Sequence, residues 1–507
     1  MFRSLRNLAR LIAIARLFAS HDALFPLETL GIFPQAARWG RRLSQGGPGG
    51  RPGERLARAL QQAGPTFIKL GQALSTRSDL LGDDIAADLA NLQDRLAPFS
   101  GAEARAAIEA EFGKPIDALF AVFDDQAIAA ASIAQVHFAV TADGREVAVK
   151  ILRPGIEAAF DRDLDLFRWV AEIIERMRPS LHRLKPLESV ETVAKTVALE
   201  LDLRLEAAAA EELAENFTSD ETFHIPAVDW QRTGRRVLTT ERVAGLPLHD
   251  RAGLIAAGHD PLAILGIAAC AMFHQVFRDG FFHADLHPGN LFVRADGNLA
   301  AVDFGIMGRL DMATRRHLAA LLIAFLTGDF RRAAEVHFEA GWIPSDNSVE
   351  AFAQACRSIG APILDRPQNE ISIARLLAQL FRVANTFQME TQPQLLLLQK
   401  TMLVAEGTGR LLAPEANMWL LAHPLIEEWA ADNLGPEARL RDAVGSLGAT
   451  LERLPGMIER LSGLADDGLR LHPDSVEALR RGSAGFPWQP FLLGGLVMGL
   501  LAVWLLT

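Results

Sequence analysis

The chain has few or none of several residue types on which whole classes of protein depend. Only two of its 507 residues are cysteine, with no Cys-x-x-Cys or Cys/His cluster around them, so neither a disulfide framework nor a zinc site is indicated. Tyrosine is absent, which removes any tyrosine acid–base role. Positive residues number 51 against 62 negative ones, a net charge of −11, so a broad electrostatic surface for nucleic acid is not expected.

Lysine is scarce beside arginine. The chain has six: Lys69, Lys114, Lys150, Lys185, Lys195 and Lys400. A lysine in such a chain is less readily explained as generic surface charge. Apolar residues, in contrast, are plentiful, because 50% of the chain is hydrophobic and 22% charged, enough to bury one large core or two medium ones. We therefore expect a folded protein of more than one lobe.

The first residues have the pattern of a basic amphipathic helix. Four arginines from Arg3 to Arg16 alternate with apolar residues, and no acid precedes Asp22. The apolar run from Leu11 to Ala15 is too short for a secretory signal. For residues 1–22 three interpretations remain: a helix lying on a membrane, a mitochondrial-type targeting segment, or a helix packed on the protein body.

The C-terminal segment is strongly apolar. Residues 491–507 read FLLGGLVMGLLAVWLLT, without a charge. At about 1.5 Å per residue a helix here would be ~26 Å long, close to the ~30 Å of a hydrocarbon core. One membrane span is predicted, and Arg480 and Arg481 on its preceding side place the protein body in the cytoplasm. A buried terminal helix is the alternative.

The hydrophobic period changes along the middle of the chain. Residues 41–54 concentrate glycine, proline and arginine and predict a flexible linker, and residues 56–120 repeat apolar positions at helical spacing. Long helical stretches are also predicted around 156–178 and 188–217. Strands are predicted at 133–140, 146–152, 236–241, 290–294 and 300–303.

These segments predict an α+β chain in which a nucleotide could lie in a cleft between two lobes. The expected parts are a linker at 41–54, a helical extension at 56–120, a strand-rich lobe with inserted helices at 121–245, a helical lobe at 246–435, a helical region at 436–485 and the terminal helix at 491–507.

The segment richest in chemical information is His-Ala-Asp-Leu-His-Pro-Gly-Asn at 283–290, followed by Asp-Phe-Gly at 303–305. Phosphoryl transfer needs cations on the phosphates and a carboxylate that orients the attacking oxygen. H-x-D-x-x-x-x-N followed by D-F-G supplies these groups at kinase spacing. Asp285 is predicted to act beside the transferred phosphoryl group, and Asn290 and Asp303 to hold Mg²⁺ through oxygen atoms.

A second motif, Val-Ala-Val-Lys, ends a predicted strand in Lys150. It matches the kinase strand whose lysine contacts the α- and β-phosphates of ATP. Its carboxylate partner is expected downstream, where Glu200, Asp202 and Glu206 lie. Because residues six apart do not share one helical face, Glu200 and Glu206 should serve different partners. Glu206 is assigned to Lys150, and a solvent-exposed acid is the alternative.

The glycine-rich loop of ordinary protein kinases is missing. Its place ahead of the lysine strand holds Ala129, Ala130, Ala131 and Ser132. Methyl groups therefore replace hydrogens along the predicted nucleotide loop, so its backbone should be less free than that of a glycine-rich loop.

The ordered set of motifs resembles the UbiB/ADCK family of atypical kinases. The motifs are K-x-G-Q at 69–72, the alanine-rich loop ending in Ser132, E-x-D at 200–202, H-x-D-x-H-P-G-N at 283–290 and D-F-G at 303–305. The match continues more weakly through Lys400 and Glu406. The resemblance implies a bilobal protein-kinase-like fold with a helical N-terminal extension.

In that family the K-x-G-Q helix folds over the cleft where a protein kinase accepts its peptide. The resemblance therefore places Lys69 and Gln72 in the active site, with Lys69 facing Glu200 and Asp202. It also implies ATP and Mg²⁺ as cofactors. By its position after the third predicted strand, 240–243 is expected to form the hinge. In that hinge, Glu241 and Val243 would offer backbone groups to adenine.

The resemblance further implies a membrane-associated, Mg²⁺-dependent ATPase or atypical kinase that supports ubiquinone (coenzyme Q) biosynthesis. Its expected partners are ATP, membrane lipid or prenyl-phenol intermediates and other ubiquinone-biosynthesis proteins, and no nucleic acid. Two alternatives stay open: a kinase of a small molecule or lipid, and a non-catalytic nucleotide-binding scaffold. The expected location is the bacterial inner membrane, with a mitochondrial one as the alternative.

Overall fold

The computed structural model describes residues 2–25, 49–75, 82–90, 96–177, 186–362, 383, 386–389, 392–414, 416 and 418–434. The chain divides into two units, residues 1–431 and 432–507. The regions predicted at 436–485 and 491–507 lie outside the described residues, as do residues 41–48 of the predicted linker.

The described part of the chain begins with helices. The first of them are α1 (Phe2–Ser20), α4 (Pro52–Ala63), α5 (Pro65–Ser75) and α7 (Asp83–Ala90). The prediction of a flexible linker is wrong for residues 52–54, which already belong to α4. Proline suits the first turn of a helix, and the Glu54 carboxylate accepts a hydrogen bond from the Arg51 backbone at 3.1 Å, which stabilises this start.

Helix α1 packs on α10 (Ile156–Met177) through its arginines. Arg6 contacts Asp165 at 2.8 Å and Arg10 contacts Asp163 at 3.0 Å. The apolar residues Leu5, Leu8 and Ile12 remain exposed. The arginines of this amphipathic helix therefore bind the protein body, together with Ile14 and Phe18, which pack against the buried cluster of α4 and α5.

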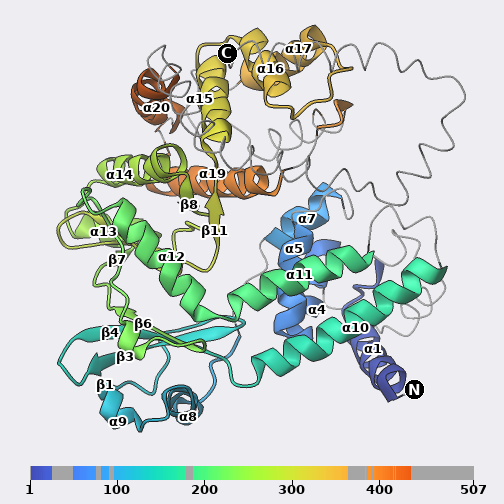
Figure 1. Ribbon diagram of the computed structural model, residues 1–507, viewed down its shortest axis with the longest axis vertical. Coiled ribbons are helices and arrows are strands. Elements are labelled where there is room, and N and C mark those ends of the chain that lie inside the picture. The colour runs from blue at the N-terminus through green and yellow to red at the C-terminus, as the bar shows by residue number, and fades with distance from the viewer. Residues whose placement is uncertain are drawn as a thin grey trace, which may run out of the picture. The chain divides into compact units, whose positions relative to one another are not determined.

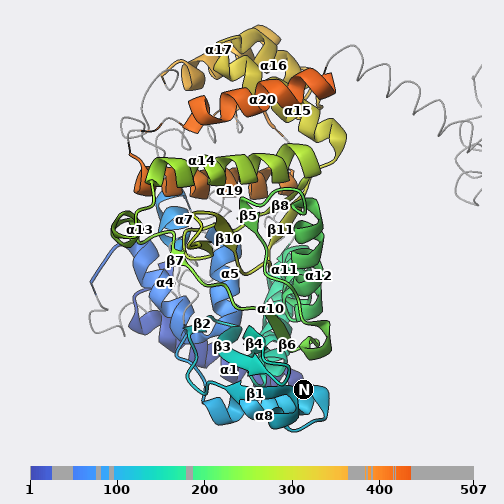
Figure 2. The same ribbon diagram turned by 90° about the vertical axis from the view of Figure 1, so that its left-hand side faces the viewer.

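The described strands of the first lobe form a five-stranded antiparallel sheet in the order β1-β3-β4-β6, with β2 paired to β3 (Figure 2). The strands are β1 (Phe120–Phe123), β2 (Ala129–Ala130), β3 (Ala134–Thr141), β4 (Glu146–Leu152) and β6 (Val237–Glu241). β3, β4 and β6 lie within one residue of the predicted segments, whereas β1 and β2 were not predicted.

Helices cover both faces of this sheet. On one face α8 (Gly101–Phe112) and α9 (Ile116–Leu119) pack with Val147, Val149 and Ile151 of β4. On the other face α10, α11 (Pro186–Glu200) and α12 (Leu203–Asn216) pack with Leu152 and Leu238. Because successive strand side chains alternate between faces, Lys150 shares the face of Leu152, toward α12.

The second lobe contains small sheets and a larger set of helices. One sheet has the order β5 (Phe223–His224), β10 (Leu299–Ala301), β9 (Leu291–Val293) and β7 (Leu246–Pro247), and β8 (Phe281–His283) pairs with β11 (Met307–Arg309). The 3₁₀ turn η2 (Trp230–Arg232) belongs with the first lobe, beside β6. The described helical elements of the second lobe are α13 (Arg251–Ala256), α14 (Pro261–Phe273), the π-helical turn η3 (His274–Asp279), α15 (Met312–Leu326), α16 (Phe330–Glu339), α17 (Val349–Gly360), α19 (Pro393–Leu412) and α20 (Met418–Leu434).

Helix α14 runs beside α19 in both views (Figures 1 and 2). Within the described part of the chain, α14 and η3 together form the one helix, Pro261–Asp279, that is long and apolar enough to cross a membrane. Ile264, Leu265 and Ala271 belong to the buried cluster of this lobe. Core packing therefore accounts for its apolar composition, since core helices share that composition.

Candidate active site

Lys150 of β4 lies between two acids that come from distant parts of the chain. Its Nζ is 2.7 Å and 2.9 Å from the two carboxylate oxygens of Glu206, and 2.9 Å from Oδ1 of Asp303. The Glu206 side chain is 7% exposed and that of Asp303 is 50% exposed. Lys150 thus joins a buried acid of α12 to an accessible acid of the D-F-G segment.

Glu206 faces inward because of its register on α12. It shares the buried face of that helix with Leu203, Ala207, Ala210 and Leu213, at the spacing expected of one helical stripe. A buried carboxylate is costly unless it is paired. The contact with Lys150, and a 3.3 Å hydrogen bond accepted from the Phe304 backbone, supply that pairing.

Mutual electrostatics set the charges of these three groups. Burial acts to lower the pKa of Lys150, but the Asp303 and Glu206 carboxylates outweigh it and raise that pKa above its usual value. Burial raises the pKa of Glu206 to about 7, against the opposing effect of Lys150. Burial also acts to raise the pKa of Asp303, but the Lys150 ammonium prevails and holds it below its usual value. Lys150 is therefore cationic and Asp303 anionic at neutral pH.

Hydrogen bonds hold the backbone around Asp285. Gln275 of η3 accepts a hydrogen bond from the His283 backbone through Oε1 at 2.9 Å, and Nδ1 of His283 accepts one from the Asp285 backbone at 3.1 Å. Nδ2 of Asn290 donates to the Asp285 carbonyl at 3.2 Å. Burial lowers the pKa of His283, which favours the neutral ring that this acceptor role requires.

Asn290 and Asp303 flank the same end of the β9–β10 ladder. The last pair of that ladder is Ala301 with Leu291, and the Val302 backbone donates to the Asn290 carbonyl at 2.9 Å. Asp303 has a φ of +66°, in the left-handed region that aspartate tolerates better than most residues.

These two residues fit a magnesium ion that is shared with phosphates. Because Nδ2 of Asn290 donates to Asp285, its Oδ1 is the atom left for a cation, and Asp303 adds a half-exposed carboxylate. Among the described residues, no three His, Cys, Asp or Glu side chains gather into a metal-binding cluster. Mg²⁺ commonly takes one or two protein oxygens together with substrate phosphates and waters.

The K-x-G-Q helix meets the E-x-D segment. Lys69 of α5 lies 2.7 Å from Oε2 of Glu200, with side chains 13% and 14% exposed. Gln72 is half-buried, one turn further along α5. Asp202 accepts a hydrogen bond from the Arg204 backbone as the N-cap of α12 and pairs with the Arg204 guanidinium at 2.6 Å.

The alanine-rich loop is a closed hairpin. Ala129 and Ala130 form β2, which pairs with β3, and the Ala131 backbone donates to the Ala134 carbonyl at 2.8 Å. Ser132 is fully buried. The guanidinium of Arg153 donates to the Ala131 carbonyl at 3.2 Å. The loop is therefore anchored to the lobe on both sides of its turn.

The predicted hinge, 240–243, follows β6. The backbone N–H of Glu241 donates to the Ala227 carbonyl at 2.8 Å, so its carbonyl is the backbone group that it could offer to adenine. The Glu241 side chain contacts Nε2 of His224 at 3.1 Å. Among the described residues none accepts a hydrogen bond from the Val243 backbone. Its N–H therefore remains available as a hinge donor.

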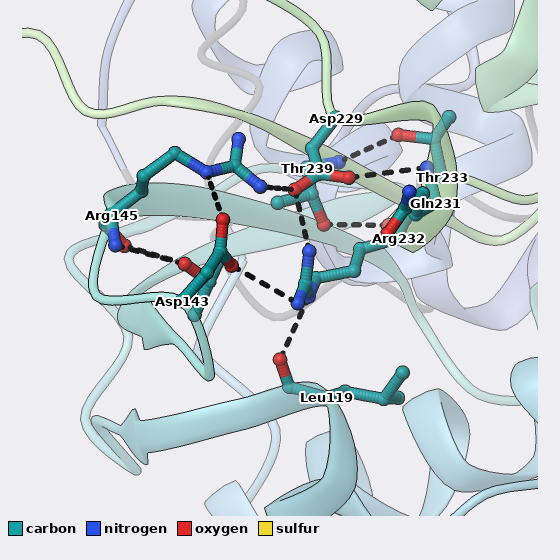
Figure 3. Close-up of polar contacts among 9 residues, drawn as sticks. Leu119, Asp143, Arg145, Asp229, Gln231, Arg232, Thr233 and Thr239 are labelled. Atoms are coloured by element: carbon teal, nitrogen blue, oxygen red, sulfur yellow. Dashed lines mark hydrogen bonds and ion pairs between the residues drawn. The ribbon is translucent and has the colours of Figure 1, made fainter.

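A buried ion network lies beside the turn between β3 and β4 (Figure 3). Arg232 donates to the Leu119 carbonyl at 2.7 Å and to Asp229 at 2.8 Å, and contacts Asp143 at 3.3 Å. Arg145 bridges Asp143 and Asp229 from the outside, at 2.6 Å and 2.7 Å. The network ties the β3–β4 turn to η2 and the start of β1.

Sequence reasoning assigned no role to one residue of the site. Lys400 of α19 lies 2.8 Å from Oδ1 of Asp285. Three of the chain's six lysines, Lys69, Lys150 and Lys400, therefore contact carboxylates of the motif segments. The scarcity of lysine and the weak continuation of the family match through Lys400 were the signals that pointed to it.

Two family models match consecutive parts of the chain. Residues 91–337 match the family model of the ABC1 atypical kinase-like domain, and residues 356–417 match that of the UbiB helical domain. Both matches agree with the α+β kinase-like fold, which is confirmed.

Curated relatives cover most of the chain. A protein named "Probable protein kinase UbiB" from Marinobacter nauticus is 42% identical over 465 residues, covering 89% of this chain and 84% of that protein. A protein of the same name from Aeromonas hydrophila is 44% identical over 391 residues, 76% of this chain and 72% of that protein.

A solved structure shows the same fold. It is the complex of Rv3197 with erythromycin from Mycobacterium tuberculosis, which matches with a TM-score of 0.51 at 24% identity and covers 70% of this chain and 91% of that chain. The resemblance predicted from the motifs is thus confirmed, and the chain belongs to the UbiB family of ABC1 atypical kinases.

Proposed function

We propose that the protein is a membrane-associated, Mg²⁺-dependent ATPase or atypical kinase that supports ubiquinone biosynthesis. The observation that carries the proposal is Lys150 held by Glu206 of α12 and Asp303 of the D-F-G segment. This triad joins the two lobes and is the pairing that phosphoryl transfer in a kinase fold requires.

Each residue has a role in that reaction. Lys150 contacts the α- and β-phosphates, Val243 donates to adenine, and Asp285 orients the attacking hydroxyl. The attacking oxygen bonds to the γ-phosphorus as the bond to the β–γ bridging oxygen breaks, its proton passes to Asp285, and ADP leaves. Asn290 and Asp303 would hold Mg²⁺, which neutralises charge on the phosphates.

We propose hydrolysis or a small acceptor rather than a protein acceptor, because Lys69 and Glu200 form a nearly buried pair. To break an ion pair that is this shielded from water, α5 and α11 must separate or both charged groups must be rehydrated.

We expect Lys69→Ala to change nucleotide affinity, self-phosphorylation or ATPase rate. Lys114→Ala, at an exposed lysine, is the matched control. A Lys69 variant equal to wild type in all three measurements would exclude this role.

The membrane and ubiquinone parts of the proposal rest on the family and on residues 491–507. Purified protein is assayed with and without liposomes and a quinone-precursor phenol, and the products are separated. Released phosphate that rises with lipid, without phosphorylated lipid or phenol, supports an ATPase that handles prenyl lipids. A phosphorylated lipid or phenol would instead identify a kinase. Protein that remains outside the bacterial inner-membrane fraction would contradict the location.

A further inference from the structure

The H-x-D loop has no cation of its own. Residues 283–290 contain neither lysine nor arginine. The nearby hydrogen bonds, from the Asp285 N–H to His283 and from Asn290 to the Asp285 carbonyl, engage the backbone of Asp285, not its carboxylate. Within the described part of the chain, Lys400 is the one donor within hydrogen-bonding distance of that carboxylate, at 2.8 Å.

The contact comes from a separate module. Lys400 lies on α19, in the region that matches the UbiB helical domain, 115 residues from Asp285. α19 packs on α14 and β11, and β11 pairs with β8, the strand that ends at His283. Helix α19, which presents Lys400, therefore packs on the strand pair that leads into the H-x-D loop.

Stability does not explain this pair. The two side chains are 43% and 31% exposed, and partly exposed ion pairs contribute only about 0–1 kcal/mol. In contrast, the rate of a reaction depends strongly on how the reacting group is oriented, because a misplacement of about 1 Å can lower the rate ~100-fold. The geometry is better suited to fixing the direction of a carboxylate than to holding helices together.

We propose that Lys400 is a positioning residue for Asp285, and that α19 thereby makes the helical domain part of the active site. The inference rests on the proposed role of Asp285 in ATP turnover. The ammonium donates to Oδ1 and leaves the second carboxylate oxygen for the attacking hydroxyl. Hydrolysis would then depend on the placement of α19 as well as on the kinase-like lobes.

The test compares Lys400→Met, Lys400→Arg and the matched control Lys114→Met in the full-length protein. Lys400→Met should lower kcat for ATP about 10- to 100-fold, with the Kd for ATP changed less than about twofold and the melting temperature unchanged. Lys400→Arg, which keeps a cationic donor, should restore most of kcat. An unchanged kcat in Lys400→Met, or an equal loss in Lys114→Met, would overturn the proposal. A rise in kcat in Lys400→Met would also overturn it, because it would show that Lys400 restrains turnover.

A double-mutant cycle separates this inference from the proposed function. If Lys400 acts through Asp285, adding Lys400→Met to Asp285→Asn should cost less than about twofold in kcat, because the two losses are not additive. Independent losses that multiply would contradict the positioning role. Full activity of Asp285→Asn alone would instead contradict the role of Asp285, whatever Lys400 does.

Discussion

At the residue scale, the chemistry depends on the burial of Glu206. Burial raises the pKa of this acid to about 7, so it is mostly protonated below that pH and mostly ionised above it. Only the ionised form pairs fully with Lys150, whose own pKa is raised. Below neutrality Lys150 therefore loses one of the two acids that hold it in place.

We expect the ATPase kcat/KM to fall about tenfold from pH 8 to pH 6, with a midpoint near 7. Glu206→Gln should lower activity at pH 8 and abolish this acidic limb, because the amide does not titrate. Glu215→Gln, at an exposed position of the same helix, should keep the wild-type profile. If Glu206→Gln shows the same fall in kcat/KM at low pH, a group other than Glu206 causes that fall.

Sequence reasoning reached most individual site residues but not all of their contacts. Lys150 and Glu206 were paired correctly, although the reason given was helical spacing, whereas the helix actually breaks between Glu200 and Glu206. Lys400 received no role because a pair 115 residues apart leaves no periodic pattern. Only folding brings such residues together.

At the element scale, the break between helices α11 and α12 sets the directions in which the Glu200 and Glu206 side chains point. Asp202 is the N-cap of α12, where its side chain accepts from the Arg204 backbone. Neither glycine nor proline marks this break, which explains why the sequence predicted one continuous helix over 188–217.

We expect Asp202→Ala to lower the free energy of unfolding by about 1 kcal/mol, whereas Asp202→Ser should retain the cap and most of the stability. If capping is the main role of Asp202, the serine variant should keep ATPase activity within about twofold. Denaturant unfolding and ATPase assays of both variants check this. A serine variant that is stable but inactive would show that the acid's charge is needed in the site.

The ion network of Figure 3 supports the sheet that presents Lys150. The side chains of Arg232 and Asp229 are 10% and 5% exposed. Arg232→Met should lower the free energy of unfolding by about 2–4 kcal/mol, since it leaves Asp229 buried with only one remaining cation. Arg145→Met, at a half-exposed position of the same network, should cost less than about 1 kcal/mol. Equal costs for the two variants would contradict the buried character of the Arg232 contacts.

Short elements explain most of what the sequence did not predict. β3, β4 and β6 were predicted, and β3 and β4 alternate in burial, whereas β2, β5 and β7 contain two residues each, too few to show a period. β8 is buried at every position, so it carries no alternation. Such strands are defined by their partners rather than by local sequence.

At the scale of the whole molecule, ion pairs join motif residues from distant parts of the chain. Lys150 of β4 contacts Glu206 of α12 and Asp303 of the D-F-G segment, Lys69 of α5 contacts Glu200, and Lys400 of α19 contacts Asp285. We expect these groups to serve one site, because each motif carries a known role in phosphoryl transfer. The regions at 436–485 and 491–507 remain predictions from composition.

Metal-dependent ATP turnover is expected to require Asp303. This is measured most directly by the steady-state release of phosphate from ATP by wild type and Asp303→Asn, each titrated with Mg²⁺. We expect Mg²⁺-dependent turnover in wild type and a loss of about 100-fold or more in the variant, with the protein still folded. Equal, Mg²⁺-independent turnover in both proteins, or full function of the variant in a deletion strain, would contradict it.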